Sequence, residues 1–232
     1  DGIRDCLLSR GLGDVYKRQV TDITGISRYA ISVSGRAGHS GTTRMQERRD
    51  ALVTASHIVT KIRDFALEIS KQDNSHFVAT VGRVEVYPNG AAIIPGHVSM
   101  ILDLRASNEK SRDRFLGNLK AACNEISHRE LCSISIDPTS YASVASMDSS
   151  LRTHIARSAE AIGLSHTSIS SGAGHDMAHM SRIAPAAMIF IPCKDGLSHC
   201  PEEFATPEAI AKGSAVVTCT VLTLAGKSLW NA

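Results

Sequence analysis

The middle of the chain alternates between two kinds of hydrophobic spacing. Every second position is apolar in four segments, which predicts β-strands. These segments are residues 29–34, 77–86, 98–104 and 132–137. Spacing by three or four positions predicts two helices, one over residues 52–69 and one from a cap at Ser107 or Asn108 to Ile126. We expect a bulge at Gly82, which interrupts the second strand.

The resulting order, strand–helix–strand–strand–helix–strand, is typical of the ferredoxin-like split motif. Such a sheet has two helices on one face and leaves the other face, or an edge, free, an arrangement that commonly pairs with a second copy. Residues 138–148 are rich in Ser and Ala and are predicted to be a linker out of this domain.

Residues 149–232 follow a different pattern. A helix is predicted over 149–162, and a last helix opens with Thr206 as N-cap and Pro207 at its first position. Between them lie a strand, a glycine-rich turn, a short helix and the apolar strand 186–191. Because two strands do not make a stable sheet, this segment is predicted to be the tail of a larger α/β domain whose beginning is missing from the chain.

Residues 1–19 show no periodicity that continues into the neighbouring segment. They resemble the translated adapter-type strings found at the ends of genes predicted from short-read assemblies. An ordinary polar N-terminal arm is the alternative. In either case we expect Leu7, Leu8 and Val15 to lie outside the core.

Composition mainly excludes classes of partner. The chain is 43% hydrophobic and only 4% aromatic, so aliphatic side chains must form most of the core. A net charge of +2 without a basic block favours neither nucleic acid nor a membrane surface, and no apolar run is long enough to span a bilayer. The six cysteines include no CxxC pair, so we expect free thiols in a reducing, cytoplasmic compartment.

Two histidines occupy loops that follow β-like segments. His175 lies in the turn 171–176 and His199 in the loop 196–203. The strand 186–191 separates them, so we expect both histidines at the edge of one sheet. Neutral imidazole is a good zinc ligand, and the pattern therefore indicates a metal site used for hydrolysis.

Six motifs in a fixed order carry a family resemblance. They are Ser34–Thr43 followed by Arg48–Ala51, Pro88–Asn89, Ile94–Gly96, Asp103–Ala106, the turn Gly172–Asp176, and Phe190–Pro192 leading to Gly196–His199. From about Val20 to the C-terminus the chain resembles the hydantoinase/carbamoylase amidases. These are N-carbamoyl-L-amino acid hydrolases, allantoate amidohydrolases and β-ureidopropionase-like enzymes of the aminoacylase/carboxypeptidase G2-type metallohydrolase superfamily. Arg44 departs from the proline that family members commonly carry there.

The resemblance implies an α/β architecture in which a ferredoxin-like βαββαβ lid/dimerisation domain, residues 28–148, precedes the C-terminal part of an α/β zinc-hydrolase catalytic domain, residues 149–232. Residues 20–27 would end the N-terminal catalytic segment, and residues 1–19 would lie outside the family. The resemblance further implies a homodimer through the lid and a small-molecule ureido or carbamoyl substrate. The complete enzyme would hold two divalent metal ions, zinc or manganese.

In the catalytic part, the resemblance assigns roles to four residues. His199 would be a metal ligand. His175 and the small Gly174 would cradle the ureido group and stabilise the tetrahedral intermediate, with His175 as the catalytic residue. Asp176 would orient the loop or His175.

In the lid, the resemblance assigns substrate binding to His39, Asn89 and Arg105. His39 and Asn89 would reach a substrate carbonyl or carboxylate, in relatives often across the dimer, and Arg105 would hold the carboxylate in a bidentate fork. From the residues alone, His39 could be an exposed loop histidine and Asn89 a simple turn residue. Arg105 could equally be a solvated strand residue.

The loop around His199 offers other candidate ligands. Cys193 and Cys200 could mimic a Cys/His zinc site, although relatives have variable small residues there and free thiols fit better. Glu202 and Glu203 could suggest a general base, but relatives place that glutamate upstream, so we expect these two to support the loop.

The largest departure from the family is an absence. The resemblance requires a His-x-Asp pair, a glutamate pair and a further ligand before the lid, and nothing ahead of His39 matches them. One histidine cannot hold a catalytic ion, so we expect these 232 residues alone to be inactive. Two alternatives stay open, an aminoacylase or peptidase of the same superfamily and a non-catalytic ferredoxin-like dimerisation module.

Overall fold

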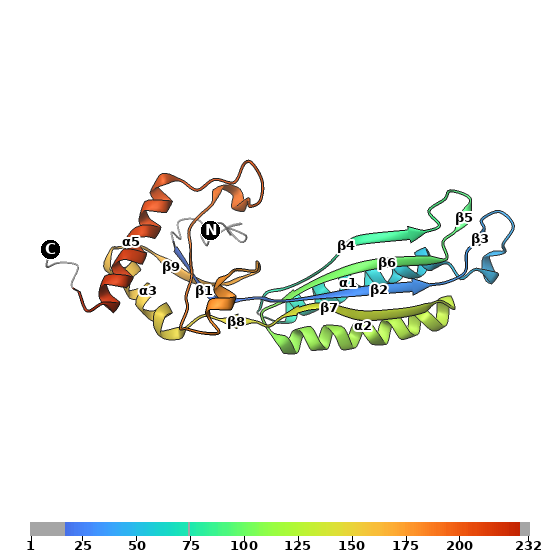
Figure 1. Cartoon of the computed structure of the whole chain (residues 1–232), viewed down its shortest axis with the longest axis horizontal. Helices are drawn as coiled ribbons and strands as arrows, with labels where there is room; N and C mark the ends of the chain where they lie inside the picture. The colour runs from blue at the N-terminus through green and yellow to red at the C-terminus, as the bar shows by residue number, and fades with distance from the viewer. Residues whose placement is uncertain (1–16, 74, 228–232) are drawn as a thin grey trace. The chain divides into compact units, whose positions relative to one another are not determined.

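The computed structural model describes residues 17–73 and 75–227 of the chain (Figure 1). It divides into two compact units. The inserted unit is Gly25–Ser143, and the flanking unit combines the residues before Gly25 with those after Ser143.

The inserted unit is a four-stranded antiparallel sheet with two helices (Figure 1). Its strands, in the spatial order β4-β6-β2-β7, are β2 (Gly25–Ser34), β4 (Phe77–Tyr87), β6 (His97–Ala106) and β7 (Ser133–Ala142). The helices are α1 (Ala51–Gln72) and α2 (Glu109–Glu130). A short ribbon of β3 (Gly38–His39) and β5 (Ile93–Ile94) and the 3-10 turn η1 (Met45–Glu47) complete the unit.

The sheet of the inserted unit has one apolar and one polar face. Along β6 every second residue is buried, from Val98 to Ala106, and these side chains share one core with both helices. Phe115 of α2 is fully buried there. The alternate residues, which include Asp103 and Arg105, lie on the opposite face, where no helix of this unit packs.

The strands of the inserted unit extend beyond their predicted ends, since β2 begins at Gly25 and β7 ends at Ala142. The expected bulge at Gly82 is confirmed by a register shift between Val81 and Arg83. The predicted linker at 138–148 is wrong in its first part, because β7 continues through Pro138 to Ala142 and pairs with β2. Since β7 is the last strand of the sheet, a proline is tolerated on its outer edge.

The flanking unit has a sheet of four strands, the two expected within residues 149–232 and two from outside that segment. Its first strand, β1, pairs parallel with β9 and antiparallel with β8 and β10. The strands are β1 (Lys17–Ile23), β8 (Ala145–Ser146), β9 (His166–Ser171) and β10 (Ile189–Phe190). Its helices are α3 (Ser149–Ala161), the short α4 (Met177–Met180) and α5 (Pro207–Leu224), and η2 (Lys194–Gly196) is a 3-10 turn.

The strand β1 also corrects the boundary of the N-terminal arm. Residues 17–19, which the sequence pattern assigned to that arm, are part of β1, and Gln19 is buried. Polar residues interrupt the apolar pair Val20 and Ile23, so the strand has no visible alternation, yet β9 and β10 enclose it. The predictions for Leu7, Leu8 and Val15 lie outside the described residues.

The helix starts follow the capping signals. Thr206 Oγ1 accepts a hydrogen bond from the Ala209 amide at 3.1 Å, and Asn108, one of the two expected caps, accepts from the Lys110 amide at 2.9 Å. Across 17–73 and 75–227, no helix combines the length and the apolar character needed to cross a membrane.

Candidate functional site

The His175 turn is built around a buried serine. Ser171, the last residue of β9, is 1% exposed, and its hydroxyl lies 3.1 Å from His175 Nε2. The same hydroxyl contacts the Ala173 carbonyl at 3.0 Å and the Ala173 amide at 3.3 Å. The His175 ring also packs against Phe190 of β10, with ring centroids 5.6 Å apart. Ser171 and Phe190 thus hold the imidazole from two sides.

Two arrangements of the proton between Ser171 and His175 fit these contacts. When the Ser171 hydroxyl donates to the Ala173 carbonyl, its oxygen accepts from the Ala173 amide and from a protonated Nε2 of His175. When the hydroxyl instead donates to Nε2, the proton of the neutral His175 ring is on Nδ1. The turn fixes the direction of the ring, and the second arrangement leaves Nδ1 as a donor.

Ser171 is the residue of this turn that sequence reasoning missed. Asp176, which was expected to orient the loop or His175, begins α4 but makes no side-chain cap. Gly174 is exposed at the crest of the turn. A serine four residues before a loop histidine, at the end of a strand, is the signal that could have found Ser171.

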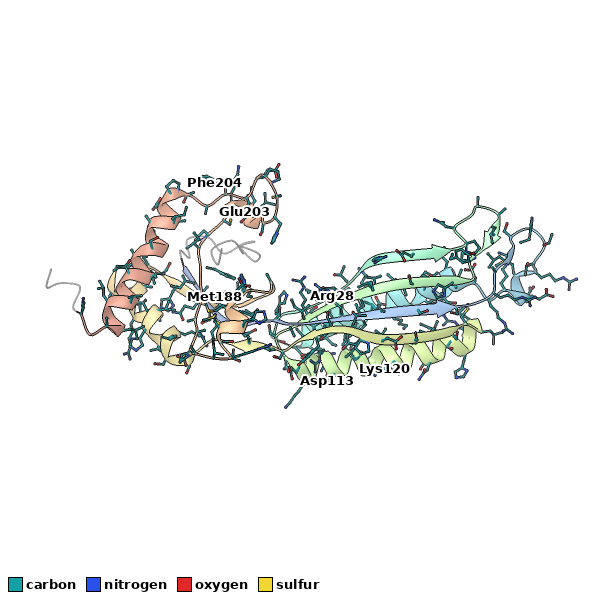
Figure 2. All side chains as sticks on the ribbon, in the orientation of Figure 1. Arg28, Asp113, Lys120, Met188, Glu203 and Phe204 are labelled. Carbon is teal, nitrogen blue, oxygen red and sulfur yellow. The ribbon has the colours of Figure 1, made fainter. Side chains whose placement is uncertain are left out.

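The His199 loop is shaped by its backbone. His199 has a φ of 59°, and its amide donates to Glu203 Oε2 at 2.9 Å. Glu203 therefore supports the loop, as expected. The Lys194 amide donates to the Phe204 carbonyl at 2.8 Å and closes the loop at its base. Figure 2 labels Glu203 and Phe204 on this segment.

The two histidine loops leave one sheet in different directions. Both β9 and β10 pair with β1, which agrees with the expected common sheet. Because β9 is parallel to β1 and β10 is antiparallel, the two strands end at opposite ends of β1. His175 packs onto Phe190, and Met177 and Ala178 pack against the cluster that contains Phe190, so the first loop lies against the second strand.

The metal-binding groups around His199 are few. Within the described ranges, no three His, Cys, Asp or Glu side chains are grouped so that they could hold a metal ion. Cys193 and Cys200 are free thiols and form no Cys/His cluster with His199. A divalent ion needs three or more protein ligands, and the described part of the chain does not group three around His199.

On the polar face of the inserted unit, Asp103 joins two arginines. Its Oδ1 accepts from Arg105 Nε at 2.8 Å and its Oδ2 from Arg28 Nε at 3.0 Å. All three side chains are partly exposed, and Arg28 is labelled on β2 in Figure 2. Sequence reasoning named Asp103 only as part of a motif and overlooked Arg28, which is opposite Asp103 in the β2–β6 ladder.

His39 and Asn89 lie together at the tip of the inserted unit. His39 ends β3, which pairs with β5, and Asn89 lies in the loop between β4 and β5. Both are exposed. His39 Nδ1 accepts from the Gly41 amide at 3.0 Å, and Arg48 holds the loop by donating to the Ser40 carbonyl at 2.6 Å.

Arg105 is far from that tip. The ribbon adjoins the His97 end of β6, where Tyr87 is the ladder partner, whereas Arg105 is eight positions further along the strand. At about 3.4 Å per residue this separation is about 27 Å. One copy of the inserted unit therefore does not bring His39 and Arg105 to the same small molecule.

The sequence and structure comparisons agree with this architecture. The model of Peptidase family M20/M25/M40 matches residues 15–223. An N-carbamoyl-L-amino-acid amidohydrolase of Paenarthrobacter aurescens is 34% identical over 85% of this chain and 47% of its own length. An allantoate amidohydrolase of Bacillus subtilis is 31% identical over 89% of this chain and 49% of its own.

A solved amidase of the hydantoinase/carbamoylase family from Burkholderia multivorans is similar in fold, with a TM-score of 0.83 and 32% identity. The match covers 92% of this chain and 51% of that one. The chain thus spans about half the length of the relatives it matches. Because the family model covers nearly the whole chain, the chain belongs to Peptidase family M20/M25/M40.

Proposed function

We propose that the chain supplies the lid and the C-terminal catalytic segment of a metal-dependent amidohydrolase. The substrate would be an N-carbamoyl-L-amino acid or allantoate, cleaved at a linear C–N bond. The observation that carries this proposal is the 31–34% identity, over 85% or more of the chain, to relatives that bear these names.

The side chains of the flanking unit have distinct proposed roles. His175, held by Ser171 and Phe190, donates a hydrogen bond to the substrate carbonyl as it becomes an oxyanion, and Gly174 leaves room beside it. Asp176 would support this turn through the start of α4. His199 would be one ligand of the metal.

The metal itself does not fit the described residues. Two ions, zinc or manganese, are expected from the resemblance, but the described residues contain no group of three His, Cys, Asp or Glu side chains that could hold either of them. We therefore assign no step of the reaction to a metal on this chain and expect the chain alone to be inactive. The other ligands and the general base would come from the part of the relatives that this chain does not match.

We propose that the inserted unit is a ferredoxin-like lid that forms a homodimer. Its strand order supports the motif, with the two strands in the middle of the sheet coming first and third in the chain. The separation of about 27 Å between the tip and Arg105 supports the dimer. In a dimer, His39 and Asn89 of one copy can serve a substrate whose carboxylate is bound by Arg105 of the other.

We infer the cellular compartment from the redox state of the cysteines. Free thiols at Cys193 and Cys200 suit a reducing cytoplasm. The near-neutral charge and the small ureido or carbamoyl substrate leave no role for nucleic acid or membrane.

The family name favours a second candidate, a peptidase or aminoacylase that cleaves an ordinary amide. A third candidate, a non-catalytic dimerisation module, is favoured by the lack of a metal cluster within 17–73 and 75–227. The substrates that the protein hydrolyses distinguish both of these candidates from the amidohydrolase.

The test is reconstitution. The half of the Paenarthrobacter aurescens relative that this chain does not match is fused ahead of residue 17, and ammonia release is measured with added zinc or manganese. N-carbamoyl-L-amino acids and allantoate should react, whereas N-acetyl amino acids and dipeptides should not. Preference for the acetyl compound or dipeptide would establish the second candidate, and no turnover of any substrate the third.

Three substitutions in that fusion separate the roles. Arg105→Ala should raise KM by tenfold or more, because a charge-assisted contact worth about 2 kcal/mol is lost. His175→Ala should chiefly lower kcat, and His199→Ala should abolish turnover. Arg129→Ala, an exposed arginine on α2, is the matched control and should change neither constant.

A further inference from the structure

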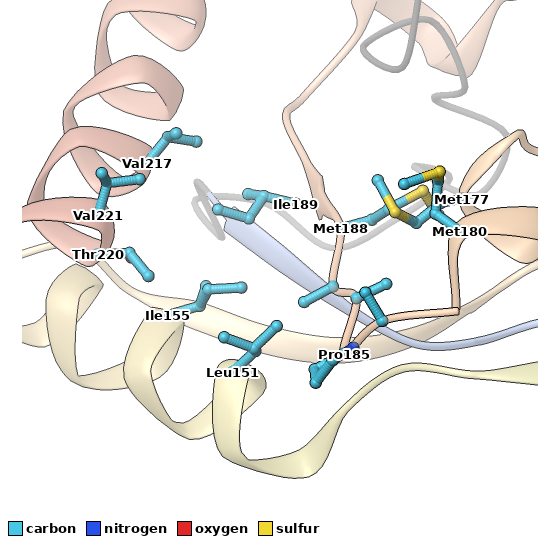
Figure 3. A pocket seen from close by; sticks show the side chains of 13 residues that line it. Leu151, Ile155, Met177, Met180, Pro185, Met188, Ile189, Val217, Thr220 and Val221 are labelled. Carbon is cyan, nitrogen blue, oxygen red and sulfur yellow. The ribbon is translucent and has the colours of Figure 1, made fainter. Parts of the chain in front are cut away.

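The cavity of the flanking unit does not suit a charged substrate. Its volume is about 500 Å³, and it lies between α3, α5 and the segment 184–189 (Figure 3). Of its thirteen lining residues only Thr220 has a side-chain oxygen or nitrogen, and that hydroxyl donates to the Val216 carbonyl at 2.8 Å. A carboxylate needs charged or hydrogen-bonding partners, and Arg105, the residue assigned to it, lies instead on the polar face of the inserted unit.

On that face, Asp103 links Arg105 to Arg28 and uses both of its carboxylate oxygens to do so. Asp103 is opposite Arg28 in the β2–β6 ladder, and Arg105 follows two positions later on the same side of β6. Both contacts are made by the Nε atom of an arginine, at 2.8 Å for Arg105 and 3.0 Å for Arg28. The three side chains therefore form one chain of contacts in the order Arg28, Asp103, Arg105.

The contact at Nε restricts how Arg105 can hold a carboxylate. A guanidinium can bind a carboxylate through its two Nη atoms or through Nε and one Nη atom. Because Asp103 accepts the single Nε proton, a substrate carboxylate is left with the mode that uses both Nη atoms. The same contact orients the planar group before the substrate arrives, and an ordered side chain loses less conformational freedom on binding.

The neighbouring strands add no charge to these three side chains. The cross-strand partners of Arg105 are Val78 of β4 and Ile26 of β2, and Thr80 of β4 is opposite Asp103. Since Asp103 balances one of the two arginines, a single positive charge is left over. That charge matches one carboxylate, which is what allantoate and the N-carbamoyl derivative of a neutral amino acid each carry.

We propose that Asp103 is a positioning residue of the carboxylate clamp and that Arg28 holds Asp103 in place from the neighbouring strand. Asp103 does not contact the substrate, and it acts by fixing the orientation of the Arg105 guanidinium. The side chains of Asp103, Arg105 and Arg28 are 25%, 31% and 47% exposed, and exposed ion pairs add little to stability. Orientation is therefore the main effect of these contacts. The inference rests on the proposed function for the identity of the carboxylate ligand.

The sign of the effect of Asp103→Ala separates positioning from simple attraction. The substitution removes a negative charge beside Arg105 and so strengthens the attraction for an anion. If Arg105 acted only through its charge, KM for N-carbamoyl-L-alanine would fall. Positioning predicts the opposite in the fusion described above, with KM raised about fivefold or more and kcat changed less than about twofold. Asp103→Asn keeps one acceptor oxygen without the charge, and its KM should lie between those of the wild type and Asp103→Ala.

A double substitution tests whether Asp103 acts through Arg105. In the Arg105→Ala background, Asp103→Ala should raise KM by less than about twofold, because no guanidinium is left to orient. Glu85→Ala is the matched control. Glu85 Oε1 accepts from Arg83 Nε at 3.0 Å, and its Oε2 contacts the Ser99 hydroxyl on the same polar face of the sheet. The control removes the same charge and the same kind of contact, yet KM should stay within about twofold of the wild type.

A measurement on the full chain needs neither turnover nor the fusion. Hydrogen exchange at Nε of Arg105 and Arg28, followed by NMR, should be slow in the wild type because each Nε–H is bonded to Asp103. Asp103→Ala should accelerate both, whereas Glu85→Ala should accelerate neither. Exchange that Asp103→Ala leaves unchanged would overturn the proposal, as would a lowered KM or a further rise of KM in the Arg105→Ala background.

A failure of the proposed activity can be told apart from a failure of this inference. If the fusion hydrolyses nothing, calorimetric titration of the metal-free fusion with N-carbamoyl-L-alanine compares the same variants by Kd. The predicted order of affinities would support the positioning role and count only against the proposed activity. A wild-type fusion that does not bind this ligand at all would overturn the clamp and, with it, the role of Asp103.

Discussion

Gly35 is in crowded surroundings, whereas Gly117 has open space beside its Cα atom. A Cβ on Gly35 would lie 2.1 Å from the carbonyl oxygen of Arg49, an atom that also accepts the Arg36 amide at 2.8 Å. A Cβ on Gly117, in the exposed interior of α2, would meet nothing within 4 Å.

The two alanine substitutions should therefore differ in sign. Gly35→Ala should destabilise the protein by about 1–3 kcal/mol, because backbone must move at the root of the His39 loop. Gly117→Ala should stabilise it by about 1 kcal/mol, since alanine costs less than glycine inside a helix. Urea unfolding of both variants measures this, and equal shifts of the midpoint would contradict it.

Burial of Cys123 makes stability depend on pH. The thiol is 4% exposed in α2, and this burial raises its pKa from 9.0 to about 11. Below pH 9 it is protonated in the folded and unfolded chain alike. Between pH 9 and 11 only the unfolded chain releases the proton, so the free energy of unfolding should fall by on the order of 2–3 kcal/mol as the pH rises.

Comparison with Cys123→Ala isolates this effect. The substitution shifts the stability at every pH by a constant, while other titrating groups act equally on both proteins. The difference between wild type and variant should therefore shrink above pH 9. A difference that stays constant to pH 11 would show that the thiol is not held protonated by the fold.

At this scale, sequence reasoning found residues with unusual chemistry and missed the neighbours that position them. His175 and Arg105 were found from their motifs. Ser171, Phe190 and Arg28 were not, because their contacts join residues far apart in the sequence, or in the case of Ser171 depend on the path of a turn.

Among the helices and strands, α5 has the start that is most clearly determined by neighbouring residues in the sequence. Thr206 caps it, Pro207 fits its first turn, and the sequence predicted both. The same was true of the helices of the inserted unit, whose apolar spacing is regular over about five turns in α1 and about three in α2.

Removing the side chain that caps α5 should destabilise the protein. Thr206→Ala should destabilise the protein by about 1 kcal/mol, because the Ala209 amide loses its acceptor. Thr206→Ser keeps the hydroxyl and should restore most of the loss. Thermal unfolding of the pair tests this, and an alanine variant as stable as the serine variant would exclude a capping role.

The strands of the flanking unit were harder to predict. β10 lies within the predicted apolar strand 186–191, but β8 has only two residues, too few for a period to show, and β1 is apolar only at Val20 and Ile23. β1 and β8 exist because β1 pairs with partners from later in the chain, and single-segment patterns do not contain that information.

At the scale of the whole molecule, the inserted unit has its own core. Eighteen buried residues from β2, β4 and β6, from its two helices and from Cys132, between α2 and β7, form one cluster, and none of them belongs to the flanking unit. The proposed dimer would use the sheet edge or helices of this unit, in a contact that repeats the same surface on both copies.

The isolated segment 25–143 should therefore unfold cooperatively and sediment as a dimer. Far-UV circular dichroism in urea and analytical ultracentrifugation are the measurements. If the segment unfolds cooperatively but stays strictly monomeric at high concentration, it folds on its own and the proposed lid dimer is wrong. The C-terminal segment of the flanking unit alone should by contrast be poorly soluble, because Ile210, Val217, Val221 and Leu224 of α5 are about half exposed.

The pairing of β1 with β8 has a consequence for how such proteins can change. Ile23 is opposite Ala145 in that ladder, so the chain departs from the flanking unit at Thr24 and returns at Val144 almost beside its point of departure. A tight two-residue turn could join these ends, and the 119 residues of Gly25–Ser143 then behave as a cassette. The inserted unit could be deleted from the protein, or replaced by another domain, without altering the pairing of β1 with β8. It could also be inserted by protein engineering into another β-hairpin with similar spacing between its strands.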